Sequence, residues 1–335
     1  MRAFHCPDCE QLVFFENTVC LTSGTPLGFD ADLREMIKPD PVRHKRCANA
    51  EAAACNWLLS GDDPHDLCRS CRLTRTRPPA GDVSSQSEFV QAEAAKRRLV
   101  FQLLELHLPV ASYLESDSGV VFDLLSSSHG PVTTGHQDGV ITLDVSESDD
   151  VHREWVRHRL AEQYRTVLGH FRHEIGHYYW PILVEQTGHL ERYRALFGDE
   201  REDYQAALDR HYNNGAPDNW ADNYVSAYAT MHPWEDWAET FAHVLHILDT
   251  LQTAVSFDLR VVGEPSAREP LHESFERVLD AWLPLTFALN AVNRSMGKDD
   301  LYPFVFPPLV LEKLAFVHAL VRDAAALVSD PMGGA

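Results

Sequence analysis

The sequence has no cysteine after Cys71 and no apolar run that approaches the roughly 18 residues of a membrane-spanning helix. The missing cysteines exclude a disulfide framework that extends along the chain, and the missing apolar run argues against an integral membrane protein. Residues 1–10 also lack the charged-then-apolar layout of a secretion signal. We therefore expect a cytoplasmic protein with reduced thiols.

Basic residues are scarce as well. The 335 residues carry 29 Lys and Arg against 50 Asp and Glu, for a net charge of −21, and 44% of the residues are hydrophobic. This composition is typical of a folded globular protein and excludes collagen, coiled coils and disorder. Residues 1–80 have a net charge of only −1. The acidic remainder would repel phosphate backbones, so nucleic acid is an unexpected partner for it.

Three regions follow one another along the chain. Residues 1–77 carry all seven cysteines and are rich in turn residues, and residues 78–87 form a linker that contains two prolines and a glycine. Residues 88–335 have mostly helical periodicity, with a first helix over about 87–106. Two short strands are expected at 120–124 and 140–145. The fold class is therefore α+β, with a small sheet in a mainly helical domain.

The sharpest motif is His173-Glu174-Ile175-Gly176-His177, an H-E-x-x-H string. Histidines four residues apart lie on one helical face, so both imidazoles can reach one Zn²⁺ while the glutamate lies beside the open coordination position. The surrounding apolar residues predict one long helix over about residues 150–180, with the histidines on its far side. His170 shares that side, where we expect it to support the site or to face solvent.

A third protein ligand is expected in the helix that starts at Pro233. Glu235 and Glu239 lie on its polar face, four residues apart, and fit one metal ligand plus one carboxylate that orients a metal-bound imidazole. Tyr228 lies seven residues before Glu235. Its phenol either donates to the oxyanion of a tetrahedral intermediate or is an ordinary core residue.

This set of residues resembles the gluzincin metallopeptidases of the anthrax lethal factor and Pro-Pro endopeptidase type, in which a tyrosine precedes the ligand glutamate by the same interval. The resemblance implies Glu174 as general base and Tyr228 as oxyanion donor. It implies a supporting role for Glu239, and a catalytic zinc that is bound by three residues: His173, His177 and Glu235.

Nearly the whole chain more closely resembles a bacterial family that joins a zinc ribbon to a zinc-binding metallopeptidase domain. The similar stretches run from residue 4 to about residue 306: FHCPDCEQLVFFENTVC, CNWLL, LCRSCRLTRT, FRHEIGHYYW, YATMHPWEDWAETFAH and NRSMGKDDLYPFVF. The resemblance implies a zinc-ribbon module over residues 1–77 and a metallopeptidase-like domain over residues 88–335.

The cysteines predict one complete zinc site and one degenerate site. The second C-x2-C knuckle and the two cysteines before it supply four thiolates for a structural zinc: Cys47, Cys55, Cys68 and Cys71. The first knuckle, Cys6 and Cys9, has only Cys20 downstream, and Ser23 stands where the resembled family has its fourth cysteine. A neutral hydroxyl is a poor zinc ligand, so this site should bind weakly or stay empty. His5 or water could substitute, and the sequence does not select between them.

Without a firm metal, the first half of the module needs another source of stability. We expect it to be held by the packing of five apolar side chains, in part onto the second half: Leu12, Val13, Phe14, Phe15 and Phe29.

These features predict a zinc metallopeptidase that hydrolyses peptides or proteins with metal-activated water, in which the strand at 140–145 forms a cleft edge that pairs with the substrate. Two alternatives stay open. One is a binding protein whose ribbons recruit a protein or a nucleic acid and whose metallopeptidase-like domain is non-catalytic. The other is a metal-dependent amidase that acts on a non-peptide substrate. Only a basic run beside the second knuckle favours nucleic acid: Arg69, Arg72, Arg75 and Arg77.

Overall fold

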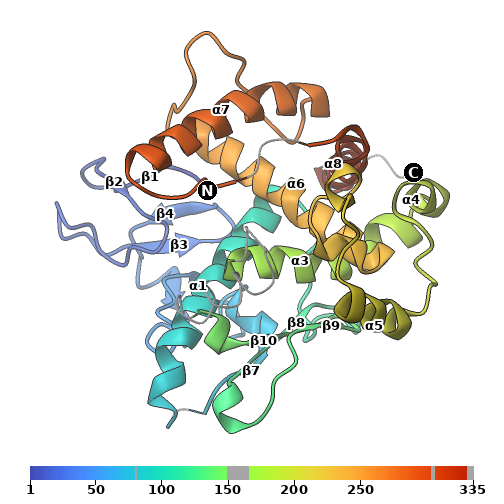
Figure 1. Ribbon diagram of the computed structural model, residues 1–335. Coiled ribbons are helices and arrows are strands. Elements are labelled where there is room, and N and C mark those ends of the chain that lie inside the picture. The colour runs from blue at the N-terminus through green and yellow to red at the C-terminus, as the bar shows by residue number, and fades with distance from the viewer. Residues whose placement is uncertain (80, 149–165, 303–305, 330–335) are drawn as a thin grey trace, which may run out of the picture. The chain divides into compact units, whose positions relative to one another are not determined.

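The computed structural model describes residues 1–79, 81–148, 166–302 and 306–329 (Figure 1). By their internal contacts the residues form two compact units, one of residues 1–105 and 109–153 and the other of residues 106–108 and 154–335. The fold is α+β, as the sequence predicts, because short strands are found in the first unit and helices make up most of the second.

Three antiparallel two-stranded hairpins make up the cysteine-bearing module. The paired strands are β1 (Phe4–His5) with β2 (Leu12–Val13), β3 (Gly28–Asp30) with β4 (Glu35–Ile37), and β5 (His44–Arg46) with β6 (Leu58–Ser60). Isolated hairpins are marginally stable in water, so strands of two or three residues need a shared core.

An aromatic cluster supplies that core. The ring centroids of Phe15 and Phe29 are 4.9 Å apart, and those of Phe29 and Trp57 are 4.8 Å apart. The predicted burial of Val13, Phe15 and Phe29 is confirmed. For Leu12 and Phe14 it is wrong, because these two alternate along the chain with the buried side chains and are 42% and 71% exposed.

Helix α1 (Val83–Glu105) begins four residues before the expected start at residue 87 and buries Phe89 and Leu99 as predicted. The sheet that follows has the strand order β7, β8, β10, β9. Its strands are β7 (Thr74–Thr76), β8 (Val121–Leu125), β9 (Gly135–Gln137) and β10 (Val140–Asp144).

Strand β10 lies inside this sheet. It pairs in parallel with β8 along its whole length and antiparallel with β9 over residues 140–142. Both of its edges are therefore hydrogen-bonded where β9 runs beside it. The expectation that this strand offers a free edge to a peptide is therefore wrong for residues 140–142. No sequence signal revealed the short β9 as a neighbour.

The second unit consists of helices joined by loops and short helical turns. The helices are α3 (Val167–Trp180), α4 (Leu190–Phe197), α5 (Tyr204–Asn214), α6 (Pro233–Ser256), α7 (Phe275–Ser295) and α8 (Pro308–Ser329). The helix expected over 150–180 is shorter, because Thr166 is extended and its hydroxyl accepts a hydrogen bond from the amide of Gly169 as an N-cap. Residues 149–165 lie outside the described residues.

Helices α3 and α6 lie side by side at the centre of this unit (Figure 1). The indole of Trp237 donates to the carbonyl oxygen of Gly176 at 2.9 Å, and Tyr179 stacks on Phe241 with 5.6 Å between ring centroids. A Cβ atom at Gly176 would lie 3.1 Å from the Cα of Ala238. The missing side chain therefore lets the backbones of the two helices approach closely.

None of the helices in the described part of the chain is both long enough and apolar enough to cross a bilayer.

Candidate metal centres

Helices α3 and α6 bring two histidines and a glutamate to one point. Ligand atoms of His173, His177 and Glu235 all lie within 4.8 Å of one another, and all three residues are buried. The Nε2 atom of His173 is 3.0 Å from Oε2 of Glu235 and 3.2 Å from Nε2 of His177. Two imidazoles and one carboxylate form the donor set of a catalytic zinc, which keeps a further position for water or substrate. The residues therefore fit the ion that their spacing predicts.

Glu239, one turn further along α6, contacts the other nitrogen of His173. Its Oε1 atom is 2.7 Å from Nδ1 of that ring. Burial by itself would lower the pKa of His173, but the carboxylates of Glu235 and Glu239 raise it well above its usual value. The two carboxylates thus favour the protonated ring, and a metal at Nε2 would compete with that proton. The contact also fixes which nitrogen faces the metal position.

Glu174 has one oxygen that is held and one that is not. Its Oε1 atom is 3.0 Å from Nε2 of His170, whereas Oε2 is buried and has no hydrogen-bond partner among the described residues. Burial raises the pKa of Glu174, but the hydrogen bond from His170 and the neighbouring histidines lower it below its usual value. The carboxylate is thus ionised, with a free oxygen that can accept a proton. His170 lies outside the three-residue ligand group.

Tyr228 lies beside the ligand group, in the short helical turn Tyr228–Thr230 before α6. Its ring centroid is 6.0 Å from that of His173, and the residue is half-buried. Burial raises the pKa of Tyr228 above its usual value, so the phenol keeps its proton and can act as a donor.

A second phenol at this site, Tyr204, was not expected from the sequence. Its hydroxyl donates to Oε1 of Glu235 at 3.0 Å. Asp203 caps the start of α5 by accepting from the amide of Ala206, and this cap positions Tyr204 as the first residue of the helix. The capping aspartate is a sequence feature that could have predicted the start of α5. No rule of residue spacing, however, links Tyr204 to a glutamate in another helix.

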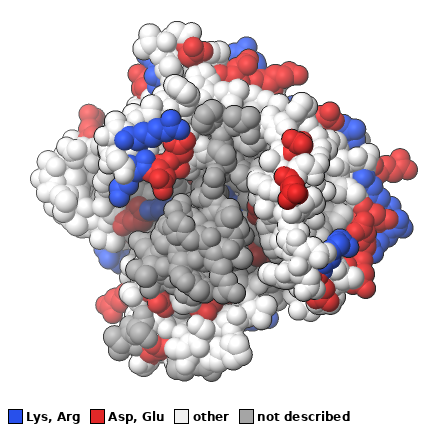
Figure 2. All heavy atoms as spheres, viewed as in Figure 1, with Lys and Arg blue, Asp and Glu red and all other residues white. Residues whose placement is uncertain are grey.

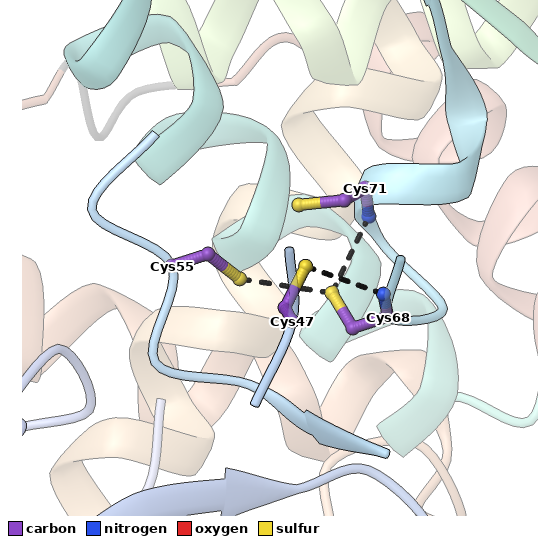
Figure 3. A group of neighbouring side chains, drawn as sticks. All are labelled: Cys47, Cys55, Cys68 and Cys71. Carbon is purple, nitrogen blue, oxygen red and sulfur yellow. Dashed lines mark hydrogen bonds between the residues drawn. The ribbon is translucent and has the colours of Figure 1, made fainter. Parts of the chain in front are cut away.

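Four cysteines form a separate buried group in the first unit (Figure 3). The Sγ atoms of Cys55 and Cys68 are 3.6 Å apart. The amide of Cys68 donates to Sγ of Cys47 at 3.3 Å, and the amide of Cys71 donates to Sγ of Cys68 at 3.5 Å. None of the four is more than 4% exposed. Four enclosed thiolates fit a structural zinc, which is coordinated only by protein.

The other three cysteines also meet. Sulfur atoms of Cys6, Cys9 and Cys20 lie within 4.8 Å of one another, and Oγ of Ser23 is 3.4 Å from Sγ of Cys6. His5 is not part of this group in the described structure. The serine thus lies beside the three sulfur atoms, as expected for the position at which the resembled family has its fourth cysteine.

Two sequence families match the chain. Residues 85–320 match the family described as "Putative zinc-binding metallo-peptidase", and residues 3–82 match a zinc-ribbon domain. Among the similar proteins are uncharacterized proteins of Mycobacterium tuberculosis and Mycobacterium bovis. Each is 51% identical over 329 residues, which cover 97% of this chain and 96% of the relative. No solved structure matches the chain.

Proposed function

The chain belongs to the zinc-binding metallo-peptidase family and carries the zinc ribbon before it, and on that premise we propose that it is a gluzincin-type peptidase that hydrolyses peptide bonds. The observation that carries this proposal is the convergence of His173, His177 and Glu235 next to Glu174, whose Oε2 is buried without a hydrogen-bond partner in the described structure. Such an oxygen is available to accept the proton of a water molecule, as a general base does.

His173, His177 and Glu235 would hold the zinc ion. When bound, Zn²⁺ supplies the Lewis acidity that makes water nucleophilic near neutral pH. Glu174 accepts the proton of the attacking water on Oε2, while His170 holds Oε1 and so fixes the direction of the carboxylate. Because Glu174 is ionised at neutral pH, it is ready to accept that proton.

Three further side chains would complete the site. Tyr228 donates its hydroxyl proton in a hydrogen bond to the oxyanion that forms on the substrate carbonyl. Glu239 holds His173 through Nδ1, and Tyr204 holds Glu235 through Oε1. These last two contacts orient metal ligands and do not touch the substrate.

Outside the group of Cys6, Cys9 and Cys20, the zinc content that we propose is one catalytic and one structural ion. The structural ion would be held in the group of Cys47, Cys55, Cys68 and Cys71. All seven cysteines are free thiols, and a metal site of thiolates is typical of a reducing compartment, so we also propose a cytoplasmic location.

The test is Glu174→Gln, with Glu185→Gln as the matched control because Glu185 is exposed at the end of the same helical segment. The full chain is incubated with a proteome-derived peptide library, and new termini are counted by mass spectrometry. We expect Glu174→Gln to keep its zinc and to lose cleavage by about 10²–10⁴-fold, because general-base catalysis contributes that much. Cleavage by Glu174→Gln at the wild-type rate would refute the proposal, and Glu185→Gln should cleave normally.

The nucleic-acid alternative has little support in the contacts of the basic run. Arg72 lies 3.7 Å from Glu115 and 3.9 Å from Asp63, and Arg75 forms an ion pair with Asp123. On the face drawn in Figure 2, basic and acidic side chains are interspersed. Two of the four arginines are thus paired with carboxylates of the protein, which weakens their attraction to phosphates.

A further inference from the structure

Ser23 lies at the fourth corner of the first cysteine group, but its hydrogen bonds keep its proton in place. Its Oγ atom accepts from the amide of Thr25 at 3.3 Å and lies 2.8 Å from Oγ1 of Thr25. The hydroxyl of Thr25 already donates to Oδ2 of Asp8. The proton between the two hydroxyls therefore comes from Ser23, which donates to Oγ1 of Thr25. A hydroxyl in this position is a donor beside a thiolate and not an anionic zinc ligand.

Among the residues that the structure describes, no other ligand side chain joins the three cysteines. Oδ2 of Asp8 is taken by Thr25 and by Nζ of Lys38 at 2.8 Å. Within the described residues, the ligand group that includes Cys6 has only Cys9 and Cys20 as further members. A structural zinc site needs four protein ligands. The residues present thus do not fit the closed site that a zinc ribbon implies.

The corner faces solvent. Cys6 and Cys20 are each 1% exposed, but Cys9 and Ser23 are exposed. A Cβ atom at Gly24, the next residue, would meet nothing within 4 Å. The complete site differs, because all of its cysteines are buried. An external ligand can therefore reach the fourth corner of the first site only.

We propose that Cys6, Cys9 and Cys20 bind zinc through three thiolates and leave a fourth position that exchanges water for an external small thiol. Zinc accepts thiolate and water as ligands, and an open position is what allows exchange at catalytic sites. The inference does not depend on peptidase activity, since it concerns a different site of the chain.

The first test compares Ser23→Cys with Ser118→Cys, which adds a thiol at an exposed position that is not part of the group. Each full-length protein is loaded with zinc and mixed with a chromogenic chelator, and zinc release is followed over time. We expect one zinc to leave the wild type and Ser118→Cys at least about tenfold faster than it leaves Ser23→Cys, where a fourth thiolate closes the site. Equal release rates would overturn the proposal.

The second test keeps the proposal falsifiable if Ser23→Cys does not fold. Co²⁺ replaces zinc in the wild type, and 2-mercaptoethanol is added while sulfur-to-cobalt charge-transfer absorbance is recorded. We expect the absorbance to increase by more in the wild type than in Cys20→Ser, which lacks the three-thiolate site and can bind the thiol only at its catalytic metal. An equal increase in the two proteins would overturn the proposal. An unchanged wild-type spectrum, or a metal content that Cys20→Ser leaves unaltered, would overturn the proposal.

Discussion

The contact between Tyr204 and Glu235 illustrates which site residues a sequence motif can predict and which it cannot. The spacing of His173 and His177 is set by the period of one helix, so the sequence was sufficient to place both on one face with Glu174 beside them. Glu235 followed from a resemblance and lies within reach of both histidines. Tyr204 approaches from another helix, and its role depends on how α5 packs, which has no local signature.

Tyr204→Phe removes the hydroxyl that donates to Oε1 of Glu235 and keeps the ring. We expect zinc affinity to fall by about 10–100-fold, since partners of metal ligands contribute that much. Competition with a fluorescent zinc chelator measures the dissociation constant. Tyr212→Phe is the matched control, because Tyr212 lies on the same helix and is 68% exposed. If the two variants bind zinc equally well, Tyr204 has no part in holding the ligand.

Helices α3 and α6 illustrate the same limit of sequence-based prediction for the bounds and the packing of helices. The start of α6 was predictable, because Pro233 suits the first turn and His232 caps it. The start of α3 was not, since the apolar periodicity before Thr166 continued that of the helix and concealed the cap. A glycine at position 176 permits a close approach of another segment, but only the structure identifies Ala238 and Phe241 as the neighbours.

Gly176→Val tests whether the two helices depend on that close approach. The new side chain would start 3.1 Å from the Cα of Ala238 and 3.2 Å from the Cβ of Phe241, so α6 must shift. We expect the free energy of unfolding to fall by about 1–3 kcal/mol, as in other overpacked cores. Zinc affinity should fall too, because α3 and α6 carry different ligands. Urea unfolding followed by tryptophan fluorescence measures the change.

Gly81→Val is the control for this substitution, because a Cβ atom there would meet nothing within 4 Å. Its effect on unfolding should stay within about 0.5 kcal/mol, as is usual for open surface sites. Equal losses in the two variants would mean that the cost comes from valine itself and not from the helix contact.

For the whole chain, the α+β class, the zinc ribbon and the peptidase family were predictable, because each rests on local spacing or on long matching stretches. The grouping into compact units was not. Thr74, at the end of the cysteine module, pairs with Phe122 of β8, and helix α1 falls in the same unit as the hairpins. Pairings between residues so far apart in sequence carry no local signal. The domain limits at residues 77 and 88 stay a prediction.

Two cysteine substitutions test how stability is shared between the metal sites and the aromatic cluster. Cys68→Ser breaks the closed, buried site, and we expect Tm to fall by about 10 °C or more, since a structural zinc contributes folding energy directly. Cys20→Ser alters the open site, where Phe15, Phe29 and Trp57 already form a buried core. Its Tm should fall by about 2 °C or less. Thermal unfolding of the zinc-loaded proteins gives both values. If Tm falls as far in Cys20→Ser as in Cys68→Ser, then metal, and not aromatic packing, stabilises the first half of the ribbon.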